Sequence, residues 1–279
     1  MKRGVSAGEP LPDPFESFGA AKATFRRGSL SMIAGPPGSM KSMMALNIVK
    51  NLKVPTLYHS SDSDSFTMAS RSLSMCSGMF NDEAEMAVLN QSEEAYEALK
   101  GMDHTRWSFA SSPTVDDLAF EADAYCEQYG EYPHLTVLDI MMDVNCEGAA
   151  EQNYWSLMAD LKDMARDHET ALLVVHHTSE SAKAGSPPPR SAIMGKANQL
   201  PALILTLWGD AKAGTIDAAV VKNRFGPQDP MAKSWMTLKV EPGICLVRDF
   251  AEGEQPTNNL LFNDGITVPE NKKVNVFEE

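Results

Sequence analysis

The sequence of 279 residues has few cysteines, a shortage of basic residues and no long hydrophobic run. Its four cysteines form no C-x-x-C pair, which excludes the usual zinc-knuckle pattern. No apolar stretch approaches the roughly 20 residues that span a bilayer, and the first residues lack the apolar core of a secretory signal. We therefore expect free thiols, no membrane partner and a cytoplasmic location.

Basic residues are outnumbered by acidic ones, 24 to 38, and the net charge is −14. This imbalance argues against a protein coated with basic groups for binding nucleic acid. It leaves open a local basic lining, such as the pore of a ring.

Apolar runs alternate with amphipathic segments, and this pattern predicts an α/β fold with a mostly parallel sheet flanked by helices. Short consecutive runs near the end add antiparallel strands. Strands are expected near residues 30–34, 56–60, 106–111, 134–142, 171–177, 202–208, 217–226, 234–242 and 244–250. Helices are expected near residues 41–52, 65–77, 82–101, 114–130 and 154–168, the last with Trp155, Met158, Leu161 and Met164 on one side. The predicted division is an N-terminal arm over 1–25, a core over 26–250 and an acidic, flexible tail over 251–279.

The stretch GPPGSMKSMM lies between an apolar run and a predicted helix, which is the context of a phosphate-binding loop. In such a loop, backbone N–H groups and the helix N-terminus wrap the phosphates. Lys41 would reach the β- and γ-phosphates, and Ser42 would place its hydroxyl on Mg²⁺. The predicted nucleotide contacts are Gly35, Pro36, Pro37, Gly38, Ser39, Met40, Lys41, Ser42 and Met43.

One position departs from the usual loop pattern, because Met40 precedes the lysine where glycine is common. A side chain is tolerated there if the backbone angles are ordinary for an L-residue. If the position needs a positive φ, methionine costs about 1 kcal/mol or more.

Acidic residues follow two of the predicted strands. Asp139 ends the run HLTVLD and is the expected partner of Ser42 at Mg²⁺, with Asp143 four residues further on. Asp62 or Asp64 could polarise the attacking water, but a residue there could equally cap the next helix. The sequence leaves this choice open.

Histidine and basic residues complete the candidate set. His176 and His177 end a strand, where one could sense the γ-phosphate while the other is buried. As a metal pair they are poor, because neighbours on a strand point to opposite faces. Lys222 and Arg224 share a strand face before a Gly-Pro turn, and two such cations suit γ-phosphate stabilisation. A solvated strand face is the alternative interpretation.

The order of these elements resembles the RecA/DnaB-like P-loop ATPases, especially DnaB-type helicase cores and core-only phage proteins of the RecA type. Asp62 and Arg71 match the nine-residue spacing of the catalytic Glu and Arg in DnaB-like proteins. The lead-in FRRGSLSMIAG is similar to the family's LxxGxLxxIAG, and K-x-R-x-G-P recurs at Lys222. The resemblance covers about residues 22–250 and makes 26–250 a RecA-like ATPase core.

The resemblance implies that ATP and Mg²⁺ are cofactors and that ATP lies between subunits of a ring, a hexamer first of all, or of a filament. Lys222 and Arg224 would then act on a neighbour's ATP. The long loop 178–195 would contact single-stranded DNA, with Lys183, Arg190 and Lys196 as backbone contacts. For a phage-encoded chain, the compartment would be the host cytoplasm.

Four departures from the family pattern stand out. Met40 replaces Gly, Asp62 replaces Glu, and the pair at 176–177 replaces Gln. The N-terminal helicase domain that contacts primase does not fit in the roughly 25 residues before the core.

Three functions follow from these residues. The first is a Mg-ATP-dependent motor acting on single-stranded or branched DNA in phage-type replication or recombination. Its candidate catalytic residues are Lys41, Asp62, Asp139, His177, Lys222 and Arg224. The second is a structure-specific nuclease that uses Asp62, Asp64, Asp139 and Asp143 with divalent metal. The third is a nucleotide-gated DNA-binding scaffold or loader with little turnover.

Overall fold

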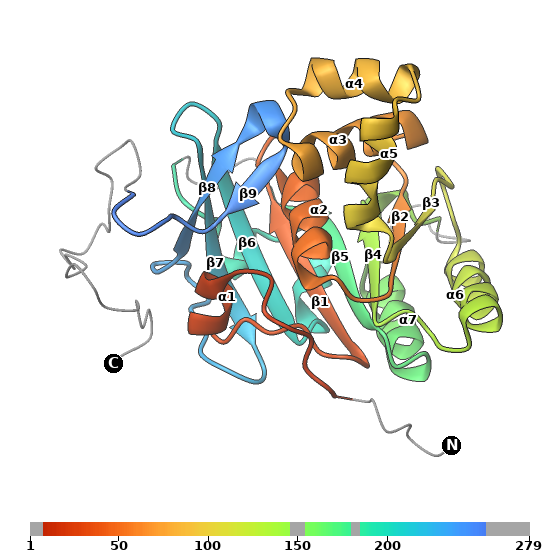
Figure 1. The fold of residues 1–279 in the computed structure, drawn as a ribbon. Helices are drawn as coiled ribbons and strands as arrows, with labels where there is room; N and C mark the ends of the chain where they lie inside the picture. Colours follow the sequence, from red (N-terminus) through yellow and green to blue (C-terminus); the bar gives the residue numbers. More distant parts are fainter. Residues whose placement is uncertain (1–7, 146–153, 180–184, 255–279) are drawn as a thin grey trace.

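The computed structural model of the chain describes residues 8–145, 154–179 and 185–254, which form a nine-stranded sheet with helices on both faces (Figure 1). The parallel strands are β1 (Ser29–Gly35), β2 (Thr56–Ser60), β3 (Thr105–Ser108), β4 (Leu135–Asp139), β5 (Ala171–His177) and β6 (Leu203–Asp210). Antiparallel pairing adds β7 (Thr215–Asn223), β8 (Met236–Glu241) and β9 (Leu246–Arg248). The predicted fold class is confirmed.

Seven α-helices occur in the described residues: α1 (Glu16–Ala20), α2 (Lys41–Leu52), α3 (Ser65–Ser77), α4 (Asn81–Leu89), α5 (Glu93–Leu99), α6 (Val115–Tyr129) and α7 (Tyr154–Asp167). Short 3₁₀ segments are η1 (Lys100–Met102), η2 (Met141–Asp143), η3 (Arg190–Ala192), η4 (Met194–Gln199) and η5 (Pro242–Ile244). Figure 1 shows α3, α4 and α5 grouped together beyond the ends of the strands, and we call this group the helical lobe. Among these helices, none has the length and apolar character that a membrane span requires.

The strand order is β3-β2-β4-β5-β1-β6-β7-β8-β9, so the phosphate-loop strand β1 lies between β5 and β6. Pairing registers align the carboxyl ends of the central strands. Gly35 pairs with His177, and Ser60 pairs with Asp139. The polar residues that end β1, β2, β4 and β5 therefore meet at one edge, which we call the phosphate-loop edge.

Two apolar layers hold the sheet between the helices. One joins α1 and α2 to the odd-numbered residues of β6, such as Leu205 and Leu207. The other packs α7 against the opposite face, where Leu157, Met158 and Leu161 meet even-numbered residues of β5 and β6. Burial on both faces explains why the central strands read as nearly continuous apolar runs.

Two helical predictions were wrong in detail. The segment 82–101 is not one stretch, because Ser92 caps a new helix by accepting a hydrogen bond from the Ala95 N–H. Gln91 forms the turn before it with φ 50°. On α7, Trp155 is exposed and the buried face is formed by Tyr154, Leu157, Met158, Leu161, Met164 and Ala165. A helical stripe predicted from spacing alone can be displaced by one residue in this way.

The described part of the predicted arm packs closely on the core. Phe15, Phe18 and Phe25 are buried in the layer that contains α2. The Asp249 carboxylate accepts hydrogen bonds from the backbone N–H groups of Glu16 and Ser17, which joins the arm to the end of the core. The boundary between arm and core at residue 25 stays a prediction, as does the tail, which lies mostly outside the described residues. Cys76, Cys126 and Cys245 are free, as expected.

Candidate functional site

The phosphate loop connects β1 to α2 and turns through two left-handed residues, Gly38 with φ 76° and Met40 with φ 61°. Position 40 therefore does require a positive φ, and methionine takes this strained conformation. Glycine is needed at Gly35 for a different reason: an added methyl group would come within 2.9 Å of the Leu207 carbonyl oxygen and would also overlap the Ser39 hydroxyl. The Ser39 hydroxyl instead donates to the Pro36 carbonyl at 2.8 Å.

Lys41 and Ser42 begin α2, at the end where backbone N–H groups lack partners within the helix. The Lys41 Nζ donates to the Pro36 carbonyl at 2.8 Å, so the side chain folds back over its own loop. The Ser42 hydroxyl donates to Asp139 Oδ1 at 2.9 Å. The predicted pairing of these two residues across β1 and β4 is present in the geometry.

Asp139 has a second partner that the motifs did not indicate. The fully buried Tyr58 of β2 donates its hydroxyl to Asp139 Oδ2 at 2.8 Å. The signal in the sequence is weak but physical, because a tyrosine inside a buried strand needs a partner for its hydroxyl. Tyr58 thus fixes the carboxylate from one side while Ser42 contacts it from the other.

Burial shifts the proton affinities of both charged groups. It lowers the pKa of Lys41 to about 8, and the nearby Asp139 carboxylate opposes the shift. Burial also raises the pKa of Asp139, against the hydrogen bonds from Tyr58 and Ser42. A buried lysine and a buried carboxylate that are both costly to ionise are the kind of pair that a charged ligand and a cation would stabilise.

The choice between Asp62 and Asp64 is settled by their contacts. Asp64 caps α3, and its carboxylate accepts the Thr67 N–H at 2.7 Å. Asp62 is exposed, and its charge raises the pKa of Asp143, for which burial is the larger cause. Asp62 therefore faces the edge that holds Asp139 and Asp143. Arg71 donates to the Ser63 hydroxyl at 3.3 Å, beside Asp62.

The residues at this edge fit Mg²⁺ when it arrives with phosphates. A hydroxyl and a buried carboxylate in contact supply the hard oxygen ligands that Mg²⁺ prefers, and few protein ligands suffice because phosphates and water complete the shell. Within the described ranges, no group of three or more His, Cys, Asp or Glu side chains is placed to hold a metal. The four aspartates of the nuclease hypothesis are accordingly not assembled as a metal-binding cluster there.

The two histidines at the end of β5 differ as expected for strand neighbours. His176 is fully buried, contacts the Met194 carbonyl through Nε2 at 3.2 Å, and has its pKa lowered to about 4 by burial. His177 is half-buried, and burial followed by the charge of Lys41 lowers its pKa. Its Nδ1 is buried and lacks a hydrogen-bond partner. His177 is therefore the neutral imidazole beside the phosphate loop.

Lys222 and Arg224 lie away from the phosphate loop of their own chain. Lys222 pairs with Ile204, which pairs with Met32, so it is two strands from β1 and about 10 Å back from Gly35 along the strand direction. Its Nζ donates to the carbonyls of residues 198 and 199 at 3.2 and 2.6 Å, ahead of β6. The Arg224 guanidinium donates to the Leu200 carbonyl at 3.4 Å.

Arg190 joins this pair, and we call Arg190, Lys222 and Arg224 the basic end. Burial lowers the pKa of Lys222 to about 8, and the charges of Arg224 and Arg190 act in the same direction. The Asn198 side chain donates to the Arg190 carbonyl at 3.0 Å. Among the ion pairs of the described residues, none joins a carboxylate to any member of the basic end.

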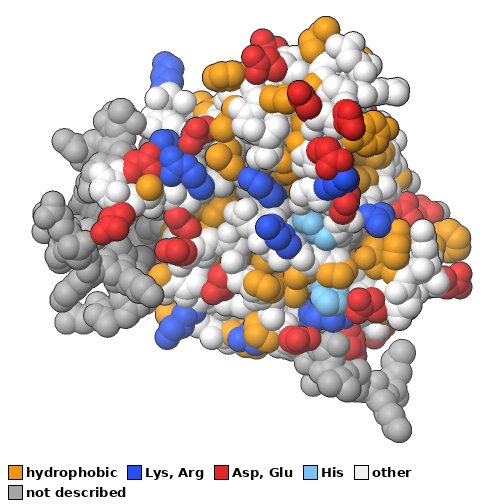
Figure 2. All heavy atoms as spheres, in the orientation of Figure 1, with side chains coloured by type: hydrophobic (Ala, Val, Ile, Leu, Met, Phe, Trp, Pro, Cys, Tyr) orange, Lys and Arg blue, Asp and Glu red, His pale blue; other side chains and the backbone are white. Residues whose placement is uncertain are grey.

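The other two expected DNA contacts have different outcomes. Lys196 is exposed within η4 at φ 58°. Lys183 lies outside the described residues. Acidic side chains gather elsewhere: Figure 2 shows them over the helical lobe, whose α4 and α5 carry Asp82, Glu83, Glu85, Glu93, Glu94 and Glu97. The negative net charge is therefore partly concentrated on the lobe, away from the basic end.

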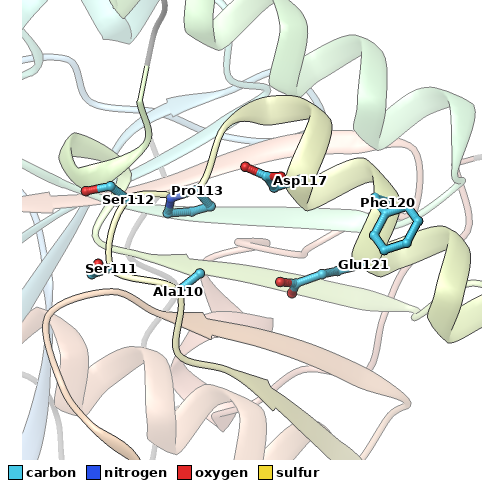
Figure 3. A pocket seen from close by; sticks show the side chains of 7 residues that line it. All are labelled: Ala110, Ser111, Ser112, Pro113, Asp117, Phe120 and Glu121. Carbon is cyan, nitrogen blue, oxygen red and sulfur yellow. The ribbon is translucent and has the colours of Figure 1, made fainter.

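A shallow hollow of about 530 Å³ lies between the end of β3 and the start of α6 (Figure 3). Its two carboxylates already have partners: Asp117 accepts from the Thr114 N–H, and Glu121 accepts from Ser108 and contacts His59 at 3.2 Å. None of the predicted nucleotide contacts lines it. The hollow is therefore separate from the candidate nucleotide site.

Comparison with known proteins identifies two phage relatives. The chain is 32% identical over 254 residues to the Gene 65 protein of Mycobacterium phage L5, with 88% of this chain and 95% of the relative covered. It belongs to the Gene 65 protein family. The Gene 65 protein of Mycobacterium phage D29 is 31% identical over 229 residues, with 78% of this chain and 98% of the relative covered. No family model matches the sequence.

Solved structures extend this Gene 65 family to a known fold. The ATPase domain of a helicase superposes with a TM-score of 0.75 at 14% identity, covering 89% of this chain and 94% of that one. A DnaB-like replicative helicase, solved with attention to its interactions with primase, gives 0.74 at 15% identity over 86% of this chain and 62% of its own. The RadB recombinase gives 0.55 at 16% identity, covering 86% and 100%. The chain has the RecA-like P-loop ATPase fold, and the predicted resemblance is confirmed.

Proposed function

We propose that this chain is a Mg-ATP-dependent, DNA-processing ATPase, a helicase- or recombinase-like motor that acts on single-stranded or branched DNA during phage replication or recombination. The observation that carries the proposal is the 2.9 Å hydrogen bond between the Ser42 hydroxyl and Asp139, formed beside Lys41 at the phosphate-loop edge. A phosphate loop, a helix N-terminus and a buried carboxylate in this arrangement suit a nucleoside triphosphate.

Each residue of the edge has a role in this proposal. Backbone N–H groups of the loop 35–43 and the start of α2 bind the phosphates, and Lys41 leaves the Pro36 carbonyl to contact the β- and γ-phosphates. Ser42 and Asp139 would hold Mg²⁺, which neutralises charge on the phosphates when bound. Asp62 orients the attacking water, and His177 contacts the γ-phosphate region as a neutral side chain.

Lys222 and Arg224 are proposed to act on the ATP of a neighbouring subunit. Support comes from their distance from the phosphate loop of their own chain and from their lack of carboxylate partners among the described ion pairs. Two cations held by backbone carbonyls are oriented but not neutralised, so they can stabilise charge on a phosphoryl group. The proposed assembly is a ring, hexameric first of all, or a filament with ATP at subunit interfaces.

DNA is proposed to run along the segment after β5, with Lys183, Arg190 and Lys196 contacting its backbone. Support comes from the exposure of Lys196 and from the position of η4, which contacts both ends of the site. Its Met194 carbonyl accepts from His176, and its Asn198 carbonyl accepts from Lys222. A segment held at both ends can respond to ATP while it touches DNA.

The test is ATP turnover measured with and without single-stranded and branched DNA, in wild type and in Lys41→Ala. We expect turnover that DNA stimulates and that Lys41→Ala abolishes. Nucleotide binding with no turnover, whether or not DNA is added, would instead indicate a scaffold or loader. DNA cleavage with Mg²⁺ or Mn²⁺ that persists in Lys41→Ala would indicate a nuclease.

A further inference from the structure

The phosphate loop contains a methionine in a conformation that favours glycine, and the side chain of this methionine has a specific neighbour. Met40 has φ 61° and ψ 33°, and it is partly buried against the apolar layer around α2. A methyl group added at Gly209 would come within 2.5 Å of the Met40 Cε atom. The end of the Met40 side chain therefore occupies the space that a side chain at position 209 would need.

Gly209 lies on the strand that supports the phosphate loop. Leu205 and Leu207 of β6 point into the layer around α2, and alternation along the strand puts position 209 on the same face. The loop backbone is close as well, since a methyl group at Gly209 would lie 3.1 Å from the Ser39 carbonyl oxygen. Together with the close approach of Gly35 to the Leu207 carbonyl, this makes β6 the floor of the phosphate loop.

We propose that Met40 is a positioning residue that seats the phosphate loop on Gly209 of β6 and thereby holds the backbone of Lys41 and Ser42 in the shape that binds nucleotide. The inference rests on the proposed nucleotide site and deepens it. Glycine at position 40 would take the same backbone angles with less strain, but it would also take many others. The methionine side chain removes that freedom, because its packing against β6 holds the loop in one conformation.

Two single substitutions and their combination test the seat. We expect Met40→Gly to weaken binding of a fluorescent ADP analogue about tenfold, because the loop loses its anchor. Gly209→Ala should weaken binding by a similar factor, because the new methyl group displaces the Met40 side chain. The double variant should bind no worse than either single variant, because both changes remove the same contact. Met40→Leu should keep most of the affinity.

Matched variants separate positioning from general stability. Gln91 has φ 50° in an exposed turn of the helical lobe, so Gln91→Gly relieves the same kind of backbone strain away from the nucleotide. Gly243→Ala crowds the Phe80 ring at 3.1 Å, as Gly209→Ala crowds Met40. Both controls should leave nucleotide affinity unchanged. Met40→Gly should lose affinity without a fall in melting temperature, which a merely structural role would not produce.

The outcomes distinguish the inference from the function on which it rests. Wild-type protein that binds no nucleotide overturns the proposed function. Wild-type protein that binds nucleotide, combined with a Met40→Gly variant that binds equally well or better, overturns the inference alone. Factors that multiply in the double variant would show two independent effects and would overturn the shared seat.

Discussion

The phosphate-loop edge and the basic end hold their charges in opposite ways. At the edge, the Asp139 carboxylate is buried, its charge acts on Lys41, and it accepts hydrogen bonds from Ser42 and Tyr58. At the basic end, backbone carbonyls orient Lys222 and Arg224, and no ion pair of the described residues neutralises them.

The difference indicates what each region needs from outside the chain. The edge lacks a phosphate for its lysine and a cation for its aspartate. The basic end lacks an anion, and the charges of Arg190 and Arg224 already lower the proton affinity of Lys222. Each chain therefore carries two incomplete halves of a charged site at different ends of the sheet, which head-to-tail association would join.

The sharpest way to break this comparison is to remove the cation of one end. We expect Arg224→Ala to lower DNA-stimulated ATP turnover about 10³-fold, the effect of losing an arginine finger. Mixing Arg224→Ala with Lys41→Ala subunits should restore part of the turnover, because intact loops then meet intact cations. Steady-state phosphate release checks both results.

Arg26→Ala is the neighbouring control for this experiment, because Arg26 lies over the Phe225 ring at 4.9 Å and has no proposed role. It should keep nearly full turnover. An absence of recovery in the mixture, together with a stable mixed oligomer, would mean that Arg224 acts within its own chain.

The next effect in size concerns the acidic side of the edge. We expect Asp62→Asn to lower kcat about 10²-fold with ATP affinity retained, because it removes the group that orients water. Asp64→Ala should leave kcat nearly unchanged and cost about 1 kcal/mol of stability, because it removes the cap of α3. Turnover and thermal unfolding of the two variants give the comparison, and reversed effects would reassign the two aspartates.

The pH dependence of binding should reveal the buried lysine. The pKa of Lys41 is about 8 in the empty site, and bound phosphates favour its charged form, so binding takes up a proton. Nucleotide affinity should therefore fall about tenfold between pH 7 and pH 9. The stability of the empty protein should change in the opposite sense, rising between about pH 8 and 10.5, because the unfolded lysine binds its proton more tightly.

Titration calorimetry in buffers of different ionisation enthalpy measures this proton uptake. Lys222 has a similar pKa of about 8 but lies at the other end of the sheet, so Lys222→Met in the unassembled chain should not alter it. A nucleotide affinity independent of pH in this range would show that Lys41 does not contact the phosphates.

The smallest expected effect is on DNA. We expect Lys196→Ala to weaken binding of single-stranded DNA roughly threefold and to reduce the salt slope by about 0.7, the value of one phosphate contact. Lys100→Ala is a suitable control, since Lys100 is an exposed lysine paired with Glu97 on the acidic lobe. Equal effects of the two substitutions on DNA affinity would place the DNA elsewhere.

Local sequence patterns predicted the strands that matter for the site, because a buried parallel strand is a short apolar run and its last residue is easily read. Asp139, His177 and Gly35 end their strands as expected, and the registers bring them to one edge. The patterns were less reliable where two helical residues compete for burial. Trp155 was assigned to the core, but Tyr154 takes the inward position against His176.

The sequence also could not decide between residues of the same type. Asp62 and Asp64 were equivalent as letters, and only the Thr67 N–H at 2.7 Å makes Asp64 the cap of α3. Tyr58 was missed because its partner Asp139 is 81 residues away. The carbonyls that hold Lys222 and Arg224 left no trace at all, since every residue has the same backbone oxygen.

The sequence by itself determined that this chain has a phosphate loop with Lys41 and Ser42, an aspartate at a neighbouring strand end, and a RecA-like order of elements. These properties depend on residue type and short spacing. Only the tertiary structure decided which aspartate faces the edge, that the basic end lies apart from the loop of its own chain, and that Met40 rests on Gly209. Such facts arise from strand register and close packing, which join residues that are far apart in the chain.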